Sequence, residues 1–205
     1  HLRTRQTVRT FALQVSPVAP RVIKPASELP LLQVAADPQG RGVVLLSGDG
    51  ESKGAVELHS PDGGAGAPPS FLDEPANAAA FSPDGKLLAV AAGAPANEDG
   101  GSLWLFDVPD AAWKTGSKPL LGRRIAVGGG MPRRIAIDAD GRLALLEVWS
   151  RPQKMGHVVQ VDLASGTVLP DFIEQANGVN TVAFSPDGRR DRKSTRLNSS
   201  HRMPS

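Results

Sequence analysis

Residues that could catalyse a reaction or bind a metal are few and widely separated in this 205-residue chain. Histidine, the usual general base and a common metal ligand, occurs away from the chain ends only as His59 and His157. Each lies on or beside the third strand expected for its repeat unit, and the two units are not neighbours. A shared metal site or a Ser/His/Asp arrangement is therefore hard to build. Because the chain also lacks cysteine, we predict no catalytic residue, no metal site and no cofactor.

Two glycine-containing motifs could instead suggest ion or phosphate binding. The sequence "DADG" (138–141) is similar to part of a calcium loop, but calcium prefers roughly six to eight oxygen ligands and only two carboxylates are nearby. The run "VGGGMP" (127–132) does not follow a strand and open a helix, as a phosphate-binding loop would. We therefore predict that both motifs are turns.

An internal repeat is the strongest signal in the chain. Four segments share an apolar strand, a tight turn that ends in glycine, and, in all but the last, a second apolar strand. They are "LLQVAADPQGRGVVLLSG", "NAAAFSPDGKLLAVAAG", "RRIAIDADGRLALLEVW" and "NTVAFSPDGRR". Their turn glycines are Gly40, Gly85, Gly141 and Gly188, separated by 45, 56 and 47 residues. Asp-Gly suits such a turn because aspartate tolerates turn geometry and glycine adopts positive φ without strain.

A third strand is expected in each complete unit at "GAVELHS", "GSLWLFDV" and "GHVVQVDL". A fourth is expected at "RRIAVGG" and "GTVLPDFI", with a weaker signal after "HSPDGG". Four short strands per repeat are typical of the blades of a β-propeller. The sequence therefore predicts an all-β fold of four-stranded antiparallel blades without a long helix.

These motifs resemble known propeller repeats. "AFSPDGKLLAV" followed by "SLWLFDV" resembles the bacterial WD40-like repeat, whereas "IAVGGGMPRRIAIDADGRL" and "HVVQVDLASGTV" resemble the YVTN or lactonase-like repeat. The Gly-His…Trp-Asp pair of eukaryotic WD40 blades is missing. The resemblance covers roughly residues 31–190 and implies an incomplete propeller, about three to four blades of a larger ring. The expected blades are 31–72, 73–129, 130–176 and the beginning of a fourth at 177–190, while 1–30 would supply outer strands of a preceding blade.

The C-terminal segment 191–205 differs in character from the repeat. It holds four basic residues and one acidic residue, a net charge of +3, which leaves −1 for residues 1–190 of a chain whose total is +2. A basic arm for nucleic acid and a solvated end are two interpretations. However, "DRKSTRLNSSH" also matches, codon by codon, the translation of a widely used sequencing adapter. We therefore expect 191–205 to be a non-native tail and predict no nucleic-acid partner.

Ligands of a propeller are expected at the loops of one face and at the mouth of the central channel. The loops between the second and third strands, at 47–54, 93–101 and 149–156, should be neighbours on one face because the repeat places equivalent loops side by side. The candidate binding residues in these loops are Asp49, Glu51, Asp99, Arg151 and Lys154. The alternative is that they are solvated, variable loop tips.

The function is predicted only in outline. We expect a binding or scaffold propeller of a bacterial protein, with a protein or small-molecule ligand at one face. The alternative that the resemblance implies is a lactonase-like hydrolase acting on a sugar lactone or a similar small ester. The apolar runs are too short to span a membrane, and an extracytoplasmic location is favoured over the cytoplasm.

The repeat also predicts which residues are buried. Apolar residues that flank the repeated turn on the paired first and second strands should form the core. They are Phe81, Leu88, Val90, Ile135, Ile137, Leu145, Val182 and Phe184.

Overall fold

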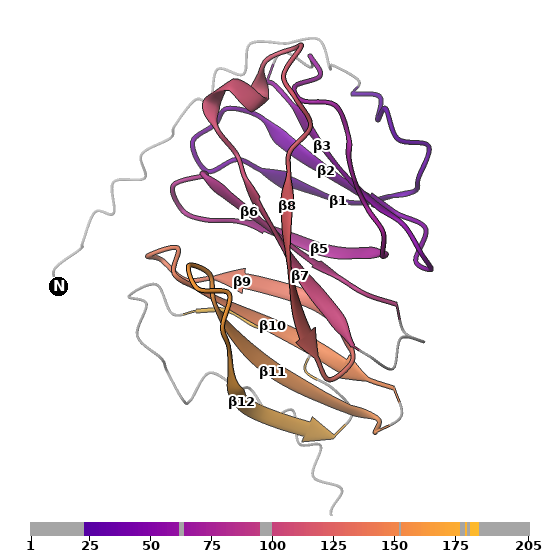
Figure 1. Cartoon of the computed structure of the whole chain (residues 1–205), viewed down its shortest axis with the longest axis vertical. Coiled ribbons are helices and arrows are strands. Elements are labelled where there is room, and N and C mark those ends of the chain that lie inside the picture. Colours follow the sequence, from indigo (N-terminus) through magenta and orange to yellow (C-terminus); the bar gives the residue numbers. More distant parts are fainter. Residues whose placement is uncertain are drawn as a thin grey trace, which may run out of the picture.

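Three four-stranded antiparallel sheets make up the described part of the chain, each formed by four strands that are consecutive in sequence (Figure 1). The computed structural model describes residues 23–184 except 62–63, 95–99, 152, 177–178 and 180, and the backbone alone for 170–176. The first sheet contains β1 (Leu31–Ala36), β2 (Val43–Gly48), β3 (Gly54–His59) and β4 (Ser70–Leu72). The second contains β5 (Ala76–Phe81), β6 (Leu87–Ala92), β7 (Gly101–Asp107) and β8 (Gly122–Gly128). The third contains β9 (Met131–Ile137), β10 (Leu143–Ser150), β11 (Met155–Asp162) and β12 (Val168–Ala176).

The first strands of the three sheets lie side by side, and the sheets follow one another like successive blades (Figure 1). The strand order within each sheet follows the sequence order, so every connection inside a sheet is a hairpin. This arrangement confirms the predicted fold class, an incomplete β-propeller of four-stranded antiparallel blades.

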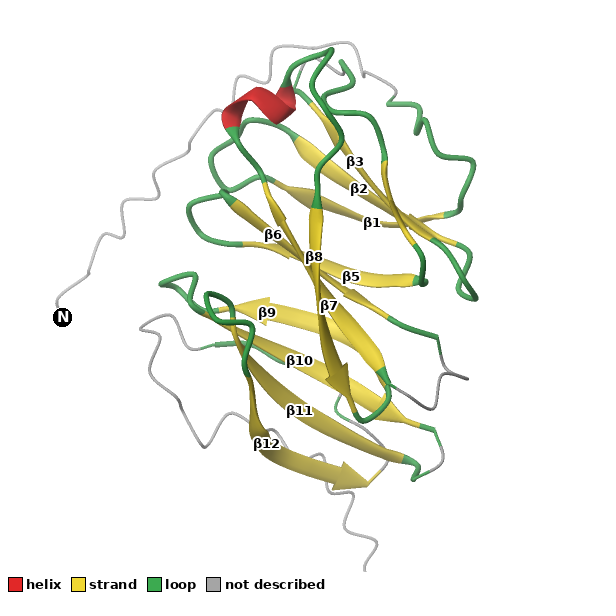
Figure 2. Cartoon of the chain, in the orientation of Figure 1, coloured by secondary structure: helices red, strands yellow, loops and turns green. Residues whose placement is uncertain are grey.

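Helical structure is nearly absent from the described residues. It consists of one short 3-10 helix, η1 (Asp110–Trp113), which follows β7 (Figure 2). Among the residues that the structure describes, there is no helix with the length and apolar character needed to cross a membrane.

The repeated turn closes each pair of first and second strands in the same way. The amide of Gly40 donates a hydrogen bond to the carbonyl of Asp37 at 2.9 Å. In the same way, Gly85 donates to the carbonyl of Ser82 at 2.8 Å, and Gly141 donates to that of Asp138 at 3.0 Å. The three glycines have φ values of 73°, 69° and 68°, in the region that a side chain disfavours. The turn therefore requires glycine at this position.

The core lies between the sheets. Leu46 of the first sheet packs with Val90 and Phe106 of the second, and all are almost completely buried. The opposite face of the second sheet packs Leu103 against Leu146 of the third. Each internal sheet is thus apolar on both faces, which explains the short, continuous apolar runs in the sequence.

The burial prediction was correct for the second strands and wrong for the first. Leu88, Val90 and Leu145 are buried, with exposed fractions of 0%, 0% and 9%. The residues predicted on the first strands are only partly buried: Phe81, Ile135, Ile137, Val182 and Phe184. Phe81, Ile135 and Ile137 lie on strands at the edge of a sheet, which have a neighbouring strand on one side only, and Val182 and Phe184 belong to none of the described sheets.

Candidate binding site

The loops of the sheets lie on two opposite faces of the molecule. The turns between first and second strands form one face, which we call the turn face (Figure 1). The loops between second and third strands begin and end at the other ends of the strands and form the loop face; their described residues are 49–53, 93–94, 100, 151 and 153–154. The charged residues of the two faces make different contacts.

On the turn face, a buried polar side chain caps each turn. The Asp37 carboxylate accepts a hydrogen bond from the amide of Arg41 at 2.9 Å, and Asp138 accepts one from Arg142 at 2.7 Å. In the second turn, the Ser82 hydroxyl accepts from the amide of Leu87 at 3.0 Å. Asp138, the first aspartate of "DADG", therefore stabilises its own turn, as turn chemistry predicts.

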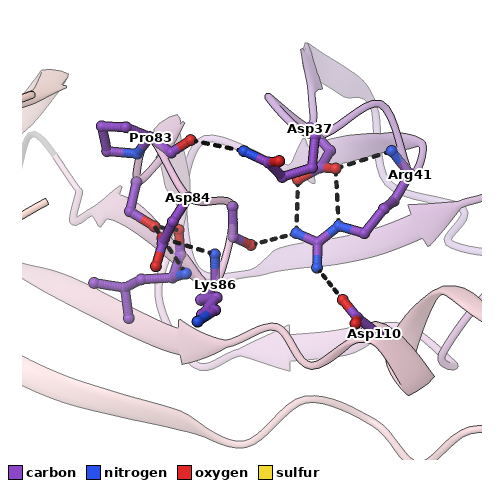
Figure 3. Close-up of polar contacts among 10 residues, drawn as sticks. Asp37, Arg41, Pro83, Asp84, Lys86 and Asp110 are labelled. Atoms are coloured by element: carbon purple, nitrogen blue, oxygen red, sulfur yellow. Dashed lines mark hydrogen bonds and ion pairs between the residues drawn. The ribbon is translucent and has the colours of Figure 1, made fainter.

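Arg41 links the first two sheets on this face (Figure 3). Its guanidinium forms two hydrogen bonds with Asp37, at 2.9 and 2.8 Å, and donates to the carbonyl of Gly85 at 2.7 Å. It also binds Asp110 at 2.6 Å and lies 5.5 Å from the ring of Trp113. These contacts tie the first turn to the second sheet.

The ion pair affects the titration of both partners. The hydrogen bonds to Asp37 raise the pKa of Arg41 further above its already high value. Burial raises the pKa of Asp37, but the hydrogen bonds and the positive charge of Arg41 outweigh this and leave that pKa below its usual value. Both groups are therefore charged at neutral pH.

The next pair of turns on the same face is joined differently. Lys86 takes the position of Arg41, and neutral Ser82 takes the position of Asp37. A hollow of about 260 Å³ lies there, lined by residues that include Asp84, Asp107 and Asp140. Lys86 therefore replaces the arginine that joins the first turn to the second, and the hollow lies between the second and third turns.

On the loop face, Asp49 organises its own loop. Its Oδ1 accepts hydrogen bonds from the backbone amides of Glu51, Ser52 and Lys53 at 2.9, 2.8 and 2.8 Å. These bonds, with that of Lys53 foremost, hold the pKa of the Asp49 carboxyl well below its usual range. Asp49 thus shapes the loop, whereas the side chain of Glu51 is exposed.

This geometry predicts a pH dependence for the loop. Because the folded-state pKa of Asp49 is depressed, its contribution to loop order is complete above the pKa of a free aspartate, about 3.9. That contribution is lost as the pH falls through the lower folded-state value. We expect the Asp49 carboxyl to titrate well below the pKa of a free aspartate in carbon-detected NMR. In Asp49→Ala, amide exchange at Glu51 to Lys53 should be faster with an unchanged unfolding midpoint. Equal exchange in both proteins would contradict this role.

The other predicted residues of the loop face are placed as follows. Arg151 and Lys154 lie in the turn between β10 and β11, where Lys154 has a φ of 51°. Both side chains are exposed. Asp99 lies outside the described residues. The structure places the loops of Asp49 and Arg151 on one face, but no hydrogen bond or ion pair joins these two loops in the described part of the chain.

A larger hollow lies at the outer edge of the loop face, beside the first sheet. Its volume is about 800 Å³, and it is bounded by the segment 26–29, the end of the Asp49 loop and the strand β4. Phe71 of β4 is 67% exposed there, although aromatic side chains usually bury most of their surface. Lys53 adds one positive charge to the lining, and Glu28 and Asp73 add two negative charges. This hollow combines apolar surface with a few polar groups, as ligand sites do.

The wall of this hollow is held in place by a buried carboxylate. The backbone amides of Ala26 and Ser27 each donate a hydrogen bond to Glu57, both at 2.7 Å. Glu57 is only 2% exposed, and Nε2 of the equally buried His59 lies 3.5 Å from it. The segment 26–29 is therefore fixed against the first sheet.

Sequence reasoning missed this hollow. The strand β4 has only three residues, and its signal after "HSPDGG" was weak. Phe71 had no repeated counterpart that would single it out. The available clue was an isolated aromatic residue among turn-forming residues in "PPSFLDEP".

Solved structures resemble this chain at low sequence identity. No family model and no curated protein matches the chain. Among solved structures, hydrazine synthase of Kuenenia stuttgartiensis is similar with a TM-score of 0.56 and 18% identity, over 76% of this chain and 53% of that one. The β-propeller domain of the trilobed protease from Pyrococcus furiosus has a TM-score of 0.48 and 19% identity, over 72% of this chain and 43% of that one. The periplasmic gluconolactonase of Pseudomonas aeruginosa has a TM-score of 0.49 and 21% identity, over 71% of this chain and 40% of that one.

The chain spans about half the length of these proteins. At an identity of 18%, the similarity to the hydrazine synthase concerns the fold and does not transfer an activity.

Proposed function

We propose that this chain is a ligand-binding β-propeller domain whose site is the hollow between the segment 26–29 and the first sheet. The observation that carries the proposal is the exposed ring of Phe71 in a hollow of about 800 Å³. That volume lies within the range of small-molecule sites, roughly 300–1,000 Å³. An exposed aromatic ring with fixed surroundings is also a frequent anchor for binding partners.

The lining suggests the chemistry of the ligand. Phe71 offers a face for an apolar or aromatic group, while Lys53 offers one positive charge and Glu28 and Asp73 offer two negative charges. A peptide with an apolar side chain beside a charged one fits this combination, and so does a small molecule of similar character. The Asp49 hydrogen bonds hold the loop that carries Lys53, so the site is organised before a ligand binds.

The loop-face charges extend the proposed surface toward the third sheet. Glu51, Arg151 and Lys154 are exposed, and no contact in the described part of the chain commits their side chains to the fold. On the turn face, by contrast, Asp37 and Arg41 hold the blades together. This difference favours the loop face as the ligand face.

Binding can be tested with peptides selected from a displayed random library on the immobilised protein. Phe71→Ala and Lys53→Glu should each weaken the selected peptides by about tenfold or more, the effect expected for loss of 1.4 kcal/mol. Leu121→Ala is the matched control, because Leu121 is 89% exposed and lies in the loop between β7 and β8, at the turn-face ends of these strands. If the selected peptides bind all three variants with the same affinity, the ligand site lies outside this hollow.

The lactonase-like alternative has a separate readout. If the protein were a lactonase, glucono-1,5-lactone incubated with it at constant pH would release acid faster than by spontaneous hydrolysis. If the protein hydrolyses the lactone and Phe71→Ala abolishes this activity, the hollow is a hydrolytic site and the binding interpretation is wrong. We expect no acceleration over the spontaneous rate.

A further inference from the structure

Two opposite charges lie beside the ring of Phe71 in the hollow next to the first sheet. Gly54 of β3 pairs with Leu72 of β4. Lys53 and Asp73 are the next residues beyond this pair, so they lie opposite each other at the loop-face end of the two strands. Both line the hollow together with Phe71. One wall therefore carries an aromatic ring with one positive and one negative charge.

The other wall carries a second negative charge. Glu28 belongs to the segment 26–29, which bounds the hollow on that side. The backbone amides of Ala26 and Ser27 donate hydrogen bonds to Glu57, so this wall is held in place by the first sheet. The hollow is thus lined by two carboxylates and one ammonium group, which sum to a charge of −1.

These three charged groups are available to a ligand. The side chains of Glu28, Lys53 and Asp73 are exposed, and none of them forms a hydrogen bond or an ion pair in the described part of the chain. The charge of Asp73 acts on Arg124, but that guanidinium is held by Glu74 at 3.0 Å, and this hydrogen bond is the main cause of the raised pKa of Arg124. Asp73 therefore remains able to attract a cation of the ligand.

We propose that the ligand of this hollow is a peptide segment in which an apolar side chain stands between one acidic and one basic side chain. The apolar side chain packs on Phe71, the acidic one faces Lys53, and the basic one faces Glu28 and Asp73. Such charge complementarity selects among partners, because juxtaposed like charges repel. The inference rests on the proposed ligand-binding function and specifies the ligand of that site.

An extended peptide brings the three groups to one side. Successive side chains of an extended chain point in opposite directions, so alternate residues share a face and lie about 6–7 Å apart. Acidic, apolar and basic residues at alternate positions are therefore presented together. The hollow has a volume of about 800 Å³ and takes a few side chains of such a segment, as small-ligand sites of roughly 300–1,000 Å³ do.

Calorimetric titration of the full chain tests the proposal with three acetylated and amidated peptides. They are Glu-Gly-Trp-Gly-Lys, Glu-Gly-Trp-Gly-Glu and Lys-Gly-Trp-Gly-Lys. We expect the first to bind about threefold or more tightly than either of the others, because each of these places one charge beside a like charge. A factor of this size is typical of exposed ion pairs, which change an equilibrium by up to about fivefold.

Charge-reversed variants should change this preference in opposite directions. Glu28→Lys should shift the ratio of affinities toward the two-glutamate peptide by about threefold or more, and Lys53→Glu should shift it as much toward the two-lysine peptide. Lys154→Glu is the matched control, because Lys154 is an exposed lysine in the turn between β10 and β11. It changes the net charge as Lys53→Glu does and should leave the ratios unchanged. All three positions are exposed, so equal unfolding midpoints are expected.

A further variant distinguishes a separate peptide from the chain itself. Phe11 is the only Phe, Trp or Tyr before residue 26, and Arg9 lies two residues from it, which gives a basic and an aromatic residue at the spacing of the probe. Phe11→Ser should leave the affinity for Glu-Gly-Trp-Gly-Lys unchanged. Tighter binding by this variant would assign the hollow to the chain's own residues and would overturn the proposal.

Equal affinities of the three peptides in every variant, or no binding of any of them, would also overturn it. If Phe71→Ala still weakens the equally bound peptides, the hollow remains a ligand site and only the charge selection is wrong. If Phe71→Ala leaves the binding of all three peptides unchanged, these peptides bind outside the hollow and the proposed function fails as well. The two failures are therefore distinguishable.

Discussion

Replacing Arg41 with alanine is expected to lower the free energy of unfolding by about 3–5 kcal/mol, the usual cost of removing one partner of a buried ion pair. The side chain of Asp37 is completely buried, and without Arg41 its carboxylate would keep only backbone hydrogen-bond donors. The substitution also removes the hydrogen bond to Gly85 and the contact with Trp113. Urea denaturation of both proteins measures the difference.

Lys86→Ala is the matched control, because Lys86 occupies the same position in the next turn. The residue that corresponds to Asp37 is Ser82 there, so no buried charge is left unpaired. We expect a change within about 0.5 kcal/mol, as for most surface substitutions. Similar losses in both variants would show that the Arg41 contacts are not what joins the first two sheets.

Replacing Phe106 with alanine is expected to destabilise the protein by about 3–5 kcal/mol, because it removes a large side chain from a packed core and leaves a cavity. Phe106 is 2% exposed and lies between the first and second sheets. Its ring also stacks near Trp104, with centroids 6.3 Å apart. Thermal and chemical denaturation should give the same ranking.

Phe81→Ala is the comparison for this prediction. Phe81 adjoins the same core, and its ring centroid lies 6.2 Å from that of Trp113, but it is only partly buried on an edge strand. We therefore expect a clearly smaller loss than for Phe106. An equal or larger loss in Phe81→Ala would mean that the edge strand is covered by another part of the protein.

The sequence by itself determined the local features of this protein. The turn glycines Gly40, Gly85 and Gly141 require positive φ, and that requirement is visible in a few consecutive residues. The short apolar runs on either side predicted strands of four-stranded antiparallel blades, and the structure confirms the all-β propeller fold. Such features are predictable because they depend on neighbouring residues and on a repeat that displays the same solution several times.

Only the tertiary structure decided the features that depend on distant segments. The hollow at the loop face exists because Glu57 binds Ala26, some thirty residues earlier in the chain, and thereby fixes a wall opposite Phe71. Likewise, Arg41 and Lys86 occupy the same position in the repeat, yet only Arg41 meets a buried carboxylate and the next blade. The repeat predicts equivalent backbones, but the neighbours of each side chain come from other blades, and these differ from one interface to the next.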